Sequence, residues 1–291
     1  MPPVSVMPTL ITLGNLVAGF SAIHYASKPD NFVGPWGWSG LTFAACLVFL
    51  GMMLDSVDGW VARLTRTTSA LGGQLDSLAD VVTFGVAPAY KMLQLVRHHV
   101  VDDTGAWIIG PEADDVLGKA IWAIAVVYVC CAALRLARYN VETGLGTIDH
   151  GSKFRGLPSP GAAGAVASLI LLHQHLLVGR LGDEVPAALA RGTALGLPFV
   201  ALLCAFAMVS TVPYVHVANR YIYGARSYPY VVRLVVTVAL LIWIPPYALA
   251  VLFTAYALSG PGQMVIRRFR GQRTGDEQSE SDDEDTHQAA S

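Results

Sequence analysis

The chain has 291 residues, of which 54% are hydrophobic and 14% are charged, and its mean hydropathy is +0.50. Soluble domains carry about 25% charged residues, so this composition indicates a membrane protein and excludes a string of soluble modules. The formal net charge of −2 points to no particular electrostatic partner, and we expect no nucleic acid to bind.

Apolar runs that approach the thickness of a bilayer occur eight times along the chain. The last two are short and are separated by Pro245 and Pro246, so a tilted hairpin or a re-entrant pair is an alternative to two full crossings. We therefore expect an all-α integral membrane protein with six core transmembrane helices and a C-terminal helical pair. The expected spans lie at 9–26, 38–62, 70–96, 117–139, 158–178, 192–213, 229–244 and 246–260.

Positively charged residues indicate the orientation of these spans, because cytoplasmic loops are enriched in Lys and Arg. With the N-terminus inside, 13 of the 19 Lys and Arg residues fall on the inner side and 5 fall on the outer side. This predicts a protein of the cytoplasmic membrane. Residues 1–262 form the predicted transmembrane domain, and residues 263–291 form a basic and then acidic tail that we expect to be disordered in the cytoplasm. Lys91, inside the third span, is expected to snorkel outward.

Four aspartates interrupt the apolar pattern of the second and third spans. Asp55 and Asp58 are three residues apart, and Asp76 and Asp80 are four residues apart, so each pair lies on one face of its helix. A short connection makes the two helices antiparallel neighbours, which brings the two pairs face to face. In the predicted orientation this part of the chain faces the cytoplasm.

Four carboxylates in a membrane protein need compensation, because each charge at depth costs about 2–3 kcal/mol even on lenient insertion scales. Arg63 alone would not compensate them, whereas divalent cations would. Oxygen ligands without Cys or His suit Mg²⁺ or Mn²⁺. Two alternatives stay open at this point. The carboxylates could pair with basic side chains and only stabilise the bundle, or they could line the path of a cation transporter.

The aspartates belong to a longer pattern, D-x2-D-G-x2-A-R-x8-G-x3-D-x3-D, which the chain matches at every fixed position. The pattern resembles the signature of the CDP-alcohol phosphotransferases, membrane enzymes that move a phosphate-linked group from a CDP-activated donor to an alcohol. A cation transporter would not require glycines and an arginine at these spacings. The matching residues are Asp55, Asp58, Gly59, Ala62, Arg63, Gly72, Asp76 and Asp80.

The resemblance implies a two-metal site and a base. Asp55, Asp58 and Asp76, with a share from Asp80, would hold two Mg²⁺ or Mn²⁺ ions that bridge the diphosphate of the donor. Asp80 would also act as the general base on the hydroxyl of the acceptor.

The resemblance also implies contacts to the CDP-linked donor. Arg63 would bind a phosphate oxygen, Gly59 would line the cytidine pocket, and Ser69 would contact a phosphate. Thr9 stands where the family usually has Asn, so no nucleotide contact is assigned to that position. The full set of expected donor-binding residues is Thr12, Gly59, Ala62, Arg63, Ser69 and Gly72.

Four further stretches narrow the choice of acceptor alcohol, and they are spread over residues 10 to 214. They resemble the bacterial phosphatidylserine synthases of this superfamily, which implies CDP-diacylglycerol and L-serine as substrates and phosphatidylserine and CMP as products. Glycerol 3-phosphate or an inositol phosphate remains the alternative acceptor. We also expect a homodimer surrounded by membrane lipids. The stretches are "LITLGNLVAGFSAI", "DSLADVVTFGVAPA", "ALRLARYNV" with "FRGLPSPGAAG", and "MVSTVPY".

Serine is a zwitterion, so its site needs a cation for the carboxylate. Arg135 and Arg138 lie three residues apart near the cytoplasmic end of the fourth span, and they supply cations on one helix face. Anchoring of the helix end by positive charge is the structural alternative for both. Ser159, between Pro158 and Pro160, is a candidate substrate contact or simply part of a helix start.

Overall fold

The computed structural model describes residues 6–29, 31–65, 70–100, 108–144, 156–176, 187–212, 214 and 228–262. Within these ranges the chain is helical and forms no β-strand. The first helices are α1 (Val6–Ala26), α2 (Gly40–Thr65), α3 (Ala70–Asp80) and α4 (Ala87–Val100). They are followed by α5 (Val116–Gly144), α6 (Ser159–Gln174), α7 (Ala187–Val209), α9 (Tyr228–Trp243) and a last helix at 245–262.

The expected all-α membrane protein is confirmed. Among the described residues, four helices are long and apolar enough to cross a bilayer. The third expected span is one helical run whose middle, η2 (Val81–Val86), is a π-helix between α3 and α4. Wide turns of this kind often occur at functional sites, and this one begins directly after Asp80. The four spans are Met7–Ala26, Gly40–Val61, Val116–Glu142 and Ala188–Val209.

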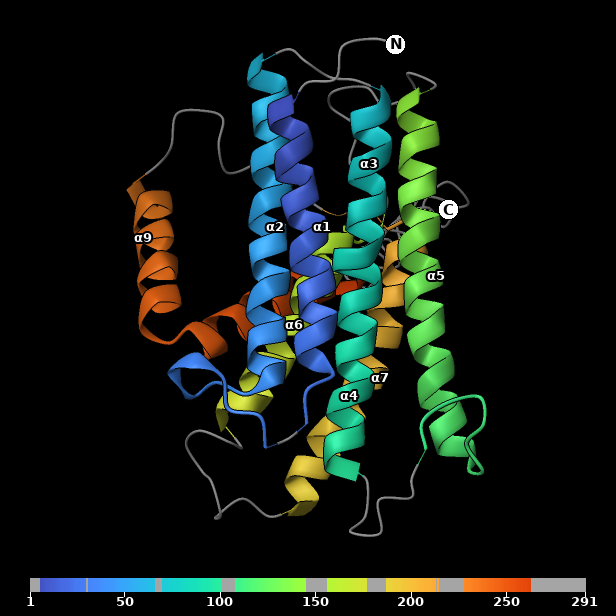
Figure 1. Ribbon diagram of the computed structural model, residues 1–291. Coiled ribbons are helices and arrows are strands. Elements are labelled where there is room, and N and C mark those ends of the chain that lie inside the picture. Colours follow the sequence, from blue (N-terminus) through green and yellow to red (C-terminus); the bar gives the residue numbers. More distant parts are fainter. Residues whose placement is uncertain are drawn as a thin grey trace, which may run out of the picture.

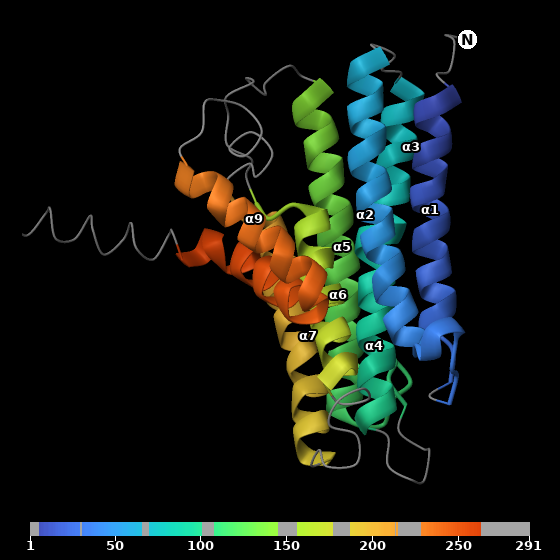
Figure 2. The same cartoon turned by 90° about the vertical axis from the view of Figure 1, so that its left-hand side faces the viewer.

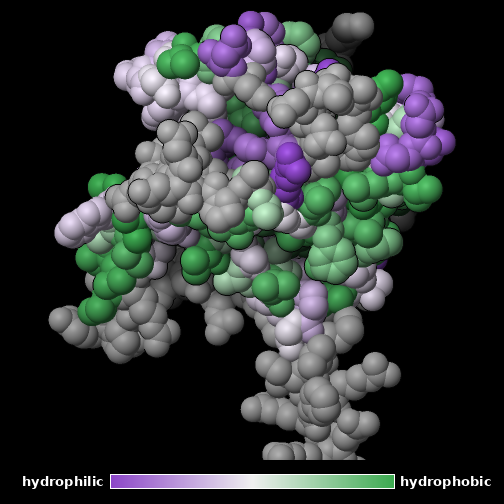
Figure 3. Space-filling view, turned by 90° about the horizontal axis from the view of Figure 1, so that it is seen from below, coloured by the Kyte–Doolittle hydropathy of each residue, from purple (hydrophilic) through white to green (hydrophobic). Residues whose placement is uncertain are grey.

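The long helices run side by side along one axis (Figures 1 and 2). α1 packs mainly on α2, α5 on α7, and α6 on α2. α2 and α5 extend well beyond the start of α6 and the end of α7 at the end of the bundle where the N-terminus lies. At the opposite end, Figure 3 shows hydrophilic side chains at the centre, at the top and at the right-hand edge of the view, with hydrophobic side chains beside and below the centre.

α9 and the helix at 245–262 form a hairpin on the side of the bundle, and both are inclined to the bundle axis (Figure 2). This is the tilted arrangement that the two prolines between these runs allow. The last helix docks on α6, where a Cβ on Gly164 would overlap the ring of Phe253. That ring also lies 5.6 Å from the ring of Phe49 on α2. The glycine therefore lets a helix from the end of the chain reach the core.

The expectation for Lys91 is wrong. Its side chain is fully buried, and its Nζ has no hydrogen-bond partner among the described residues. A lysine can snorkel only where its stem reaches the end of the helix or the lipid. Lys91 instead lies on the inward face of α4, between the buried residues Ala87 and Leu95 on the same helix, and α4 packs against α1, α6 and α7.

Candidate active site

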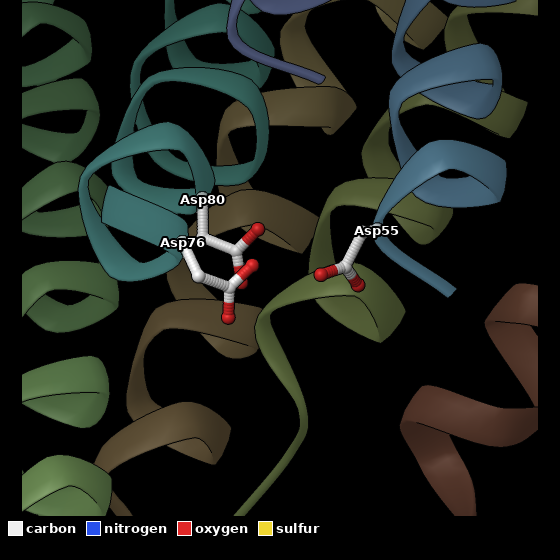
Figure 4. A group of neighbouring side chains, drawn as sticks. All are labelled: Asp55, Asp76 and Asp80. Carbon is white, nitrogen blue, oxygen red and sulfur yellow. The ribbon is translucent and has the colours of Figure 1, made fainter. Parts of the chain in front are cut away.

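Two helices bring three carboxylates together at the level where α6 begins. α2 contributes Asp55, and α3 contributes Asp76 and Asp80, and one oxygen of each lies within 4.8 Å of the others. Figure 4 shows Asp76 and Asp80 side by side on their helix and Asp55 pointing toward them from α2. The face-to-face arrangement expected from the i, i+3 and i, i+4 spacings therefore holds for these three residues.

Asp58, the fourth aspartate, is turned toward α1. The Thr12 hydroxyl donates a hydrogen bond to Asp58 Oδ2 at 2.8 Å, and both residues are buried. Thr12, expected among the donor contacts, thus lies against one of the expected metal ligands. This contact fixes the rotamer of the carboxylate and ties the first helix of the chain to the site.

Asn15 is a site residue that the sequence did not single out. Its Nδ2 donates a hydrogen bond to Asp80 Oδ1 at 3.1 Å, and the side chain is fully buried. The Thr83 hydroxyl in the π-helix donates in turn to the Asn15 carbonyl oxygen at 3.0 Å. A Cβ on Gly51 would lie 2.8 Å from Asn15 Oδ1, so the glycine makes room for this arrangement. An amide in the otherwise apolar run "LITLGNLVAGF" is the signal that could have revealed it.

The three clustered aspartates open into a cavity of about 300 Å³. Arg135 on α5 lines the same cavity and donates a hydrogen bond from Nη1 to the Ser159 hydroxyl at 2.7 Å. Its Nε is buried and has no partner among the described residues. The cavity therefore combines three carboxylates with a guanidinium whose Nε has no hydrogen-bond partner among the described residues.

Arg138 lies elsewhere, although the spacing suggested that it would act with Arg135. Its Nε donates to Glu142 Oε1 at 2.7 Å, one turn further along α5, and both side chains are more than a third exposed. Arg138 does not line the cavity. Exposed ion pairs of this kind contribute little to stability. The exposed position of Arg138 near the end of α5 agrees with the alternative role, anchoring of the helix end by positive charge.

The segment before α6 is held in an unusual conformation that presents Ser159 to the cavity. Gly156 has φ of +86°, a left-handed value that suits glycine, and a Cβ there would overlap the Met208 carbonyl oxygen. The Gly156 and Leu157 amides donate to the carbonyls of Val212 and Ala207, each at 2.9 Å. The chain is therefore fixed to the end of α7 before α6 starts.

Polar groups from distant parts of the chain complete the wall of the cavity. Asn140 on α5 donates from Nδ2 to the Ser77 hydroxyl at 2.8 Å. Tyr214, which ends the stretch "MVSTVPY", donates from its hydroxyl to the Ala257 carbonyl oxygen at 3.0 Å. Burial raises the pKa of Tyr214 to about 12, so the phenol stays neutral. Tyr256 of the last helix lies beside it, with ring centroids 6.0 Å apart.

Several expected donor contacts are not described in full. Ser69 lies outside the described residues, and Ala62 and Arg63 belong to α2 without a described side chain. Gly59 follows Asp58 on α2, and Gly72 lies in the first turn of α3. The roles of these residues in donor binding stay predictions.

The carboxylate cluster suits a hard divalent cation. Asp76 Oδ1 is buried and has no hydrogen-bond partner among the described residues. Burying a carboxylate oxygen in this way costs free energy unless another group, such as a cation, binds it. Three carboxylates within reach of one point match the all-oxygen coordination of Mg²⁺ and Mn²⁺. The residues present therefore fit the metal that the signature implies.

Comparison with known proteins supports the same assignment. A CDP-diacylglycerol–serine O-phosphatidyltransferase of Helicobacter pylori is 35% identical over 179 residues, which cover 61% of this chain and 63% of that protein. The protein of that name from Methanocaldococcus jannaschii is 28% identical over 225 residues, covering 77% and 84%. An archaetidylserine synthase of Methanothermobacter thermautotrophicus is 33% identical over 168 residues, covering 57% and 58%.

The chain thus spans less than two thirds of the length of some of these relatives. The model of the CDP-alcohol phosphatidyltransferase family matches residues 5–195, which include all four aspartates of the signature. The chain therefore belongs to the CDP-alcohol phosphatidyltransferase family.

Proposed function

We propose that the protein transfers the phosphatidyl group of CDP-diacylglycerol to the hydroxyl of L-serine, giving phosphatidylserine and CMP. The observation that carries this proposal is the cavity in which Asp55, Asp76 and Asp80 face Arg135 and Ser159. Such a cavity combines groups that suit a diphosphate-bound metal with a cation that suits an amino acid carboxylate. The activity for which the Helicobacter and Methanocaldococcus relatives are named agrees with it.

The four aspartates would bind the metal, and one of them, Asp80, would also act as the base. Asp55, Asp58, Asp76 and Asp80 would hold Mg²⁺ or Mn²⁺, which when bound neutralises the diphosphate and stabilises the departing CMP. Asp80 accepts the proton of the serine hydroxyl, and the serine oxygen forms a bond to the phosphatidyl phosphorus. The bond from that phosphorus to the oxygen of CMP breaks, and CMP leaves with the electron pair. Asn15 holds Asp80 in place for this step.

Arg135 selects the acceptor. Its unpaired Nε is placed to donate to the serine carboxylate while Nη1 is held by Ser159. Among the described residues that line the cavity, Arg135 is the one cationic side chain. Glycerol 3-phosphate and inositol phosphates carry a phosphate dianion and would need a denser cluster of cations. This observation favours serine.

The membrane context belongs to the same proposal. The protein acts in the cytoplasmic membrane with the site open to the cytoplasm, where serine is dissolved, as the Lys and Arg distribution predicts. Residues 1–262 form the catalytic domain, and the tail at 263–291 takes no part in the chemistry. A homodimer among membrane lipids is part of the same proposal.

An acceptor assay tests the proposal. Membranes containing the protein are incubated with CDP-diacylglycerol and, separately, labelled serine, glycerol 3-phosphate or inositol phosphate, with Mg²⁺ or Mn²⁺ omitted and restored. We expect CMP release and labelled lipid only with serine and metal. Turnover with glycerol 3-phosphate and none with serine would overturn the acceptor. Metal uptake into vesicles without release of CMP would favour the cation transporter instead.

A further inference from the structure

The π-helix η2 directly follows Asp80 in the helical run that carries two of the site aspartates. Its hydrogen bonds reach one residue further than those of an α-helix, as in the bond from the Ala87 amide to the Val82 carbonyl oxygen. An α-helix advances by about 100° per residue, so one extra residue in the wide turn rotates α4 by about that angle relative to α3. The wide turn thereby lets α3 present its aspartates to the cavity while α4 buries Met92 and Leu95 in the core.

Thr83 is the residue of η2 that fits between α1 and α2. Its side chain is fully buried, and it fills a space that two glycines leave open. A Cβ on Gly19 of α1 would overlap the Thr83 hydroxyl, and a Cβ on Gly51 of α2 would lie 2.5 Å from Thr83 Cγ2. The two glycines therefore form a socket for this one side chain, and the socket fixes the wide turn against both helices.

α5 holds the wide turn as well. The run from α3 through η2 to α4 lies between α1 and α5 (Figure 1). Tyr128 on α5 is fully buried, and its hydroxyl donates a hydrogen bond to the Phe84 carbonyl oxygen at 3.3 Å. A Cβ on Gly85 would lie 3.3 Å from the Cβ of Ala132, so the backbone of η2 approaches α5 closely. Contacts from three helices therefore determine where η2 sits.

Asn15 links Thr83 to Asp80. The Thr83 hydroxyl donates to the Asn15 carbonyl oxygen at 3.0 Å, and Asn15 Nδ2 donates to Asp80 Oδ1 at 3.1 Å. Because Thr83 follows Asp80 by three residues in the same helical run, the chain and the two hydrogen bonds form a closed ring. All three side chains are buried, where water competes little for these hydrogen bonds. The orientation of the Asp80 carboxylate therefore depends on both bonds.

We propose that Thr83 is a positioning residue for the transfer reaction. By fixing Asn15 at the level of the wide turn, it holds the Asp80 carboxylate where it accepts the proton of the acceptor hydroxyl. Thr83 is not among the described residues that line the cavity, so it acts through Asn15. A general base must lie within hydrogen-bond reach of the proton, so a small displacement of Asp80 lowers the rate. This inference rests on the proposed function, and it gives η2 a task in catalysis.

Thr83→Val tests the proposal, because valine keeps the branched shape that fills the socket and removes only the hydroxyl. With serine, CDP-diacylglycerol and Mn²⁺, we expect kcat to fall about 3- to 10-fold, as for the loss of one hydrogen bond between neutral groups, with KM for the donor unchanged. Thr193→Val is the matched control and should leave kcat unchanged. The Thr193 hydroxyl also donates to backbone carbonyl oxygens, but it is exposed on α7.

A double-mutant cycle with Asn15→Ala separates positioning from a general loss of packing. Asn15→Ala keeps the carbonyl oxygen that Thr83 binds but removes the amide that holds Asp80. In this background Thr83→Val should therefore lower kcat by less than about twofold. The same loss of kcat from Thr83→Val with and without the Asn15 amide would overturn the proposal.

Thr83→Ser and Thr83→Ala form a second pair, which differs only in the hydroxyl and keeps the proposal testable if Thr83→Val or Asn15→Ala does not fold. The serine variant should turn over faster than the alanine variant by the same 3- to 10-fold factor. Equal kcat values for the two would assign the role of Thr83 to packing and overturn the proposal. No serine-dependent CMP release by the unchanged protein would overturn the proposed function itself.

Discussion

Asp80 is the residue on which two separate arrangements converge. It belongs to the three-carboxylate cluster, and it accepts a hydrogen bond from Asn15 on another helix. Asp58, by contrast, accepts a hydrogen bond from Thr12 and is not one of the three carboxylates whose oxygens lie within 4.8 Å of one another. The two residues match the same signature, but their surroundings suit different tasks.

Asp80→Asn tests whether Asp80 acts as the general base or only as a metal ligand. The substitution keeps the shape and one oxygen but removes the proton acceptor, so we expect kcat to fall by about 10² to 10⁴ while metal-dependent donor binding persists. Asp58→Asn should instead weaken metal binding and recover in part as Mn²⁺ is raised. Turnover and donor binding are measured for both variants across a metal titration. If excess metal restores Asp80→Asn to near the unchanged rate, Asp80 is only a ligand.

Asn15→Ala tests the support of Asp80. Loss of one hydrogen bond to a charged group costs about 1.5–3 kcal/mol, so kcat should fall roughly 10- to 150-fold with little change in KM for the donor. Asn15→Gln retains an amide and should recover part of the rate. Ser27→Ala is the control, because Ser27 is exposed and directly follows α1, and it should leave kcat and KM unchanged. A rise in KM alone would place Asn15 in donor binding.

Arg135→Ala is expected to raise KM for serine far more than KM for CDP-diacylglycerol. Loss of a charge-assisted hydrogen bond is worth about 1.5–3 kcal/mol, or roughly 10- to 150-fold in kcat/KM for serine. Arg138→Ala is the matched control, because Arg138 is paired with Glu142 outside the cavity. Steady-state kinetics with each substrate varied in turn gives both constants. An equal loss for the two substrates would assign Arg135 to the donor site.

At the scale of elements, the connection that leads into α6 places Ser159 at the cavity. Gly156 turns the chain in a left-handed conformation, and its amide and that of Leu157 are anchored to residues at the end of α7. Ser159 consequently begins α6 at the edge of the cavity rather than at the end of the bundle.

Gly156→Ala should disturb both stability and acceptor binding. A side chain at positive φ that also meets a carbonyl oxygen destabilises by more than about 1 kcal/mol, and its displacement would move Ser159 away from Arg135. We expect a lower Tm in detergent and a higher KM for serine. Gly192→Ala in α7, where a Cβ meets no atom within 4 Å, should leave KM unchanged. Equal behaviour of the two variants would contradict the role of this connection.

The helices and the aspartates were accessible from the sequence because both follow local periodicity. Apolar runs predict the bundle helices, and the spacings of Asp55, Asp76 and Asp80 predict that they meet. Asn15 and Tyr256 were not predicted, because their places in the site depend on how α1 and the last helix pack. Arg138 shows the limit of the spacing argument, since a nearby Glu142 competes for it.

At the scale of the whole molecule, orientation decides which compartment supplies serine. The loop around Glu112 lies at the end where α5 begins, and Leu64 lies near the opposite end, on α2. Both side chains are exposed. The positive-inside distribution assigns the Leu64 end to the cytoplasm.

Thiol labelling in intact cells tests this orientation. In a variant whose four native cysteines are replaced by alanine, we expect a membrane-impermeant maleimide to label Glu112→Cys directly. Leu64→Cys should be labelled only after the membrane is permeabilised. The reverse pattern would place the site on the outer face, where cytoplasmic serine could not reach it.

The inclined last helix also determines when the cavity becomes complete during synthesis. Asp80 emerges early in synthesis, whereas Tyr256, which closes the same cavity, comes 176 residues later. At about 5–20 residues per second, roughly 9–35 s pass between the two. During that interval the acidic cluster stands in an incomplete bundle without its final wall. The newly made chain therefore acquires its closed cavity only when translation is almost finished, and a nascent chain stalled before α9 would carry its aspartates but no finished site.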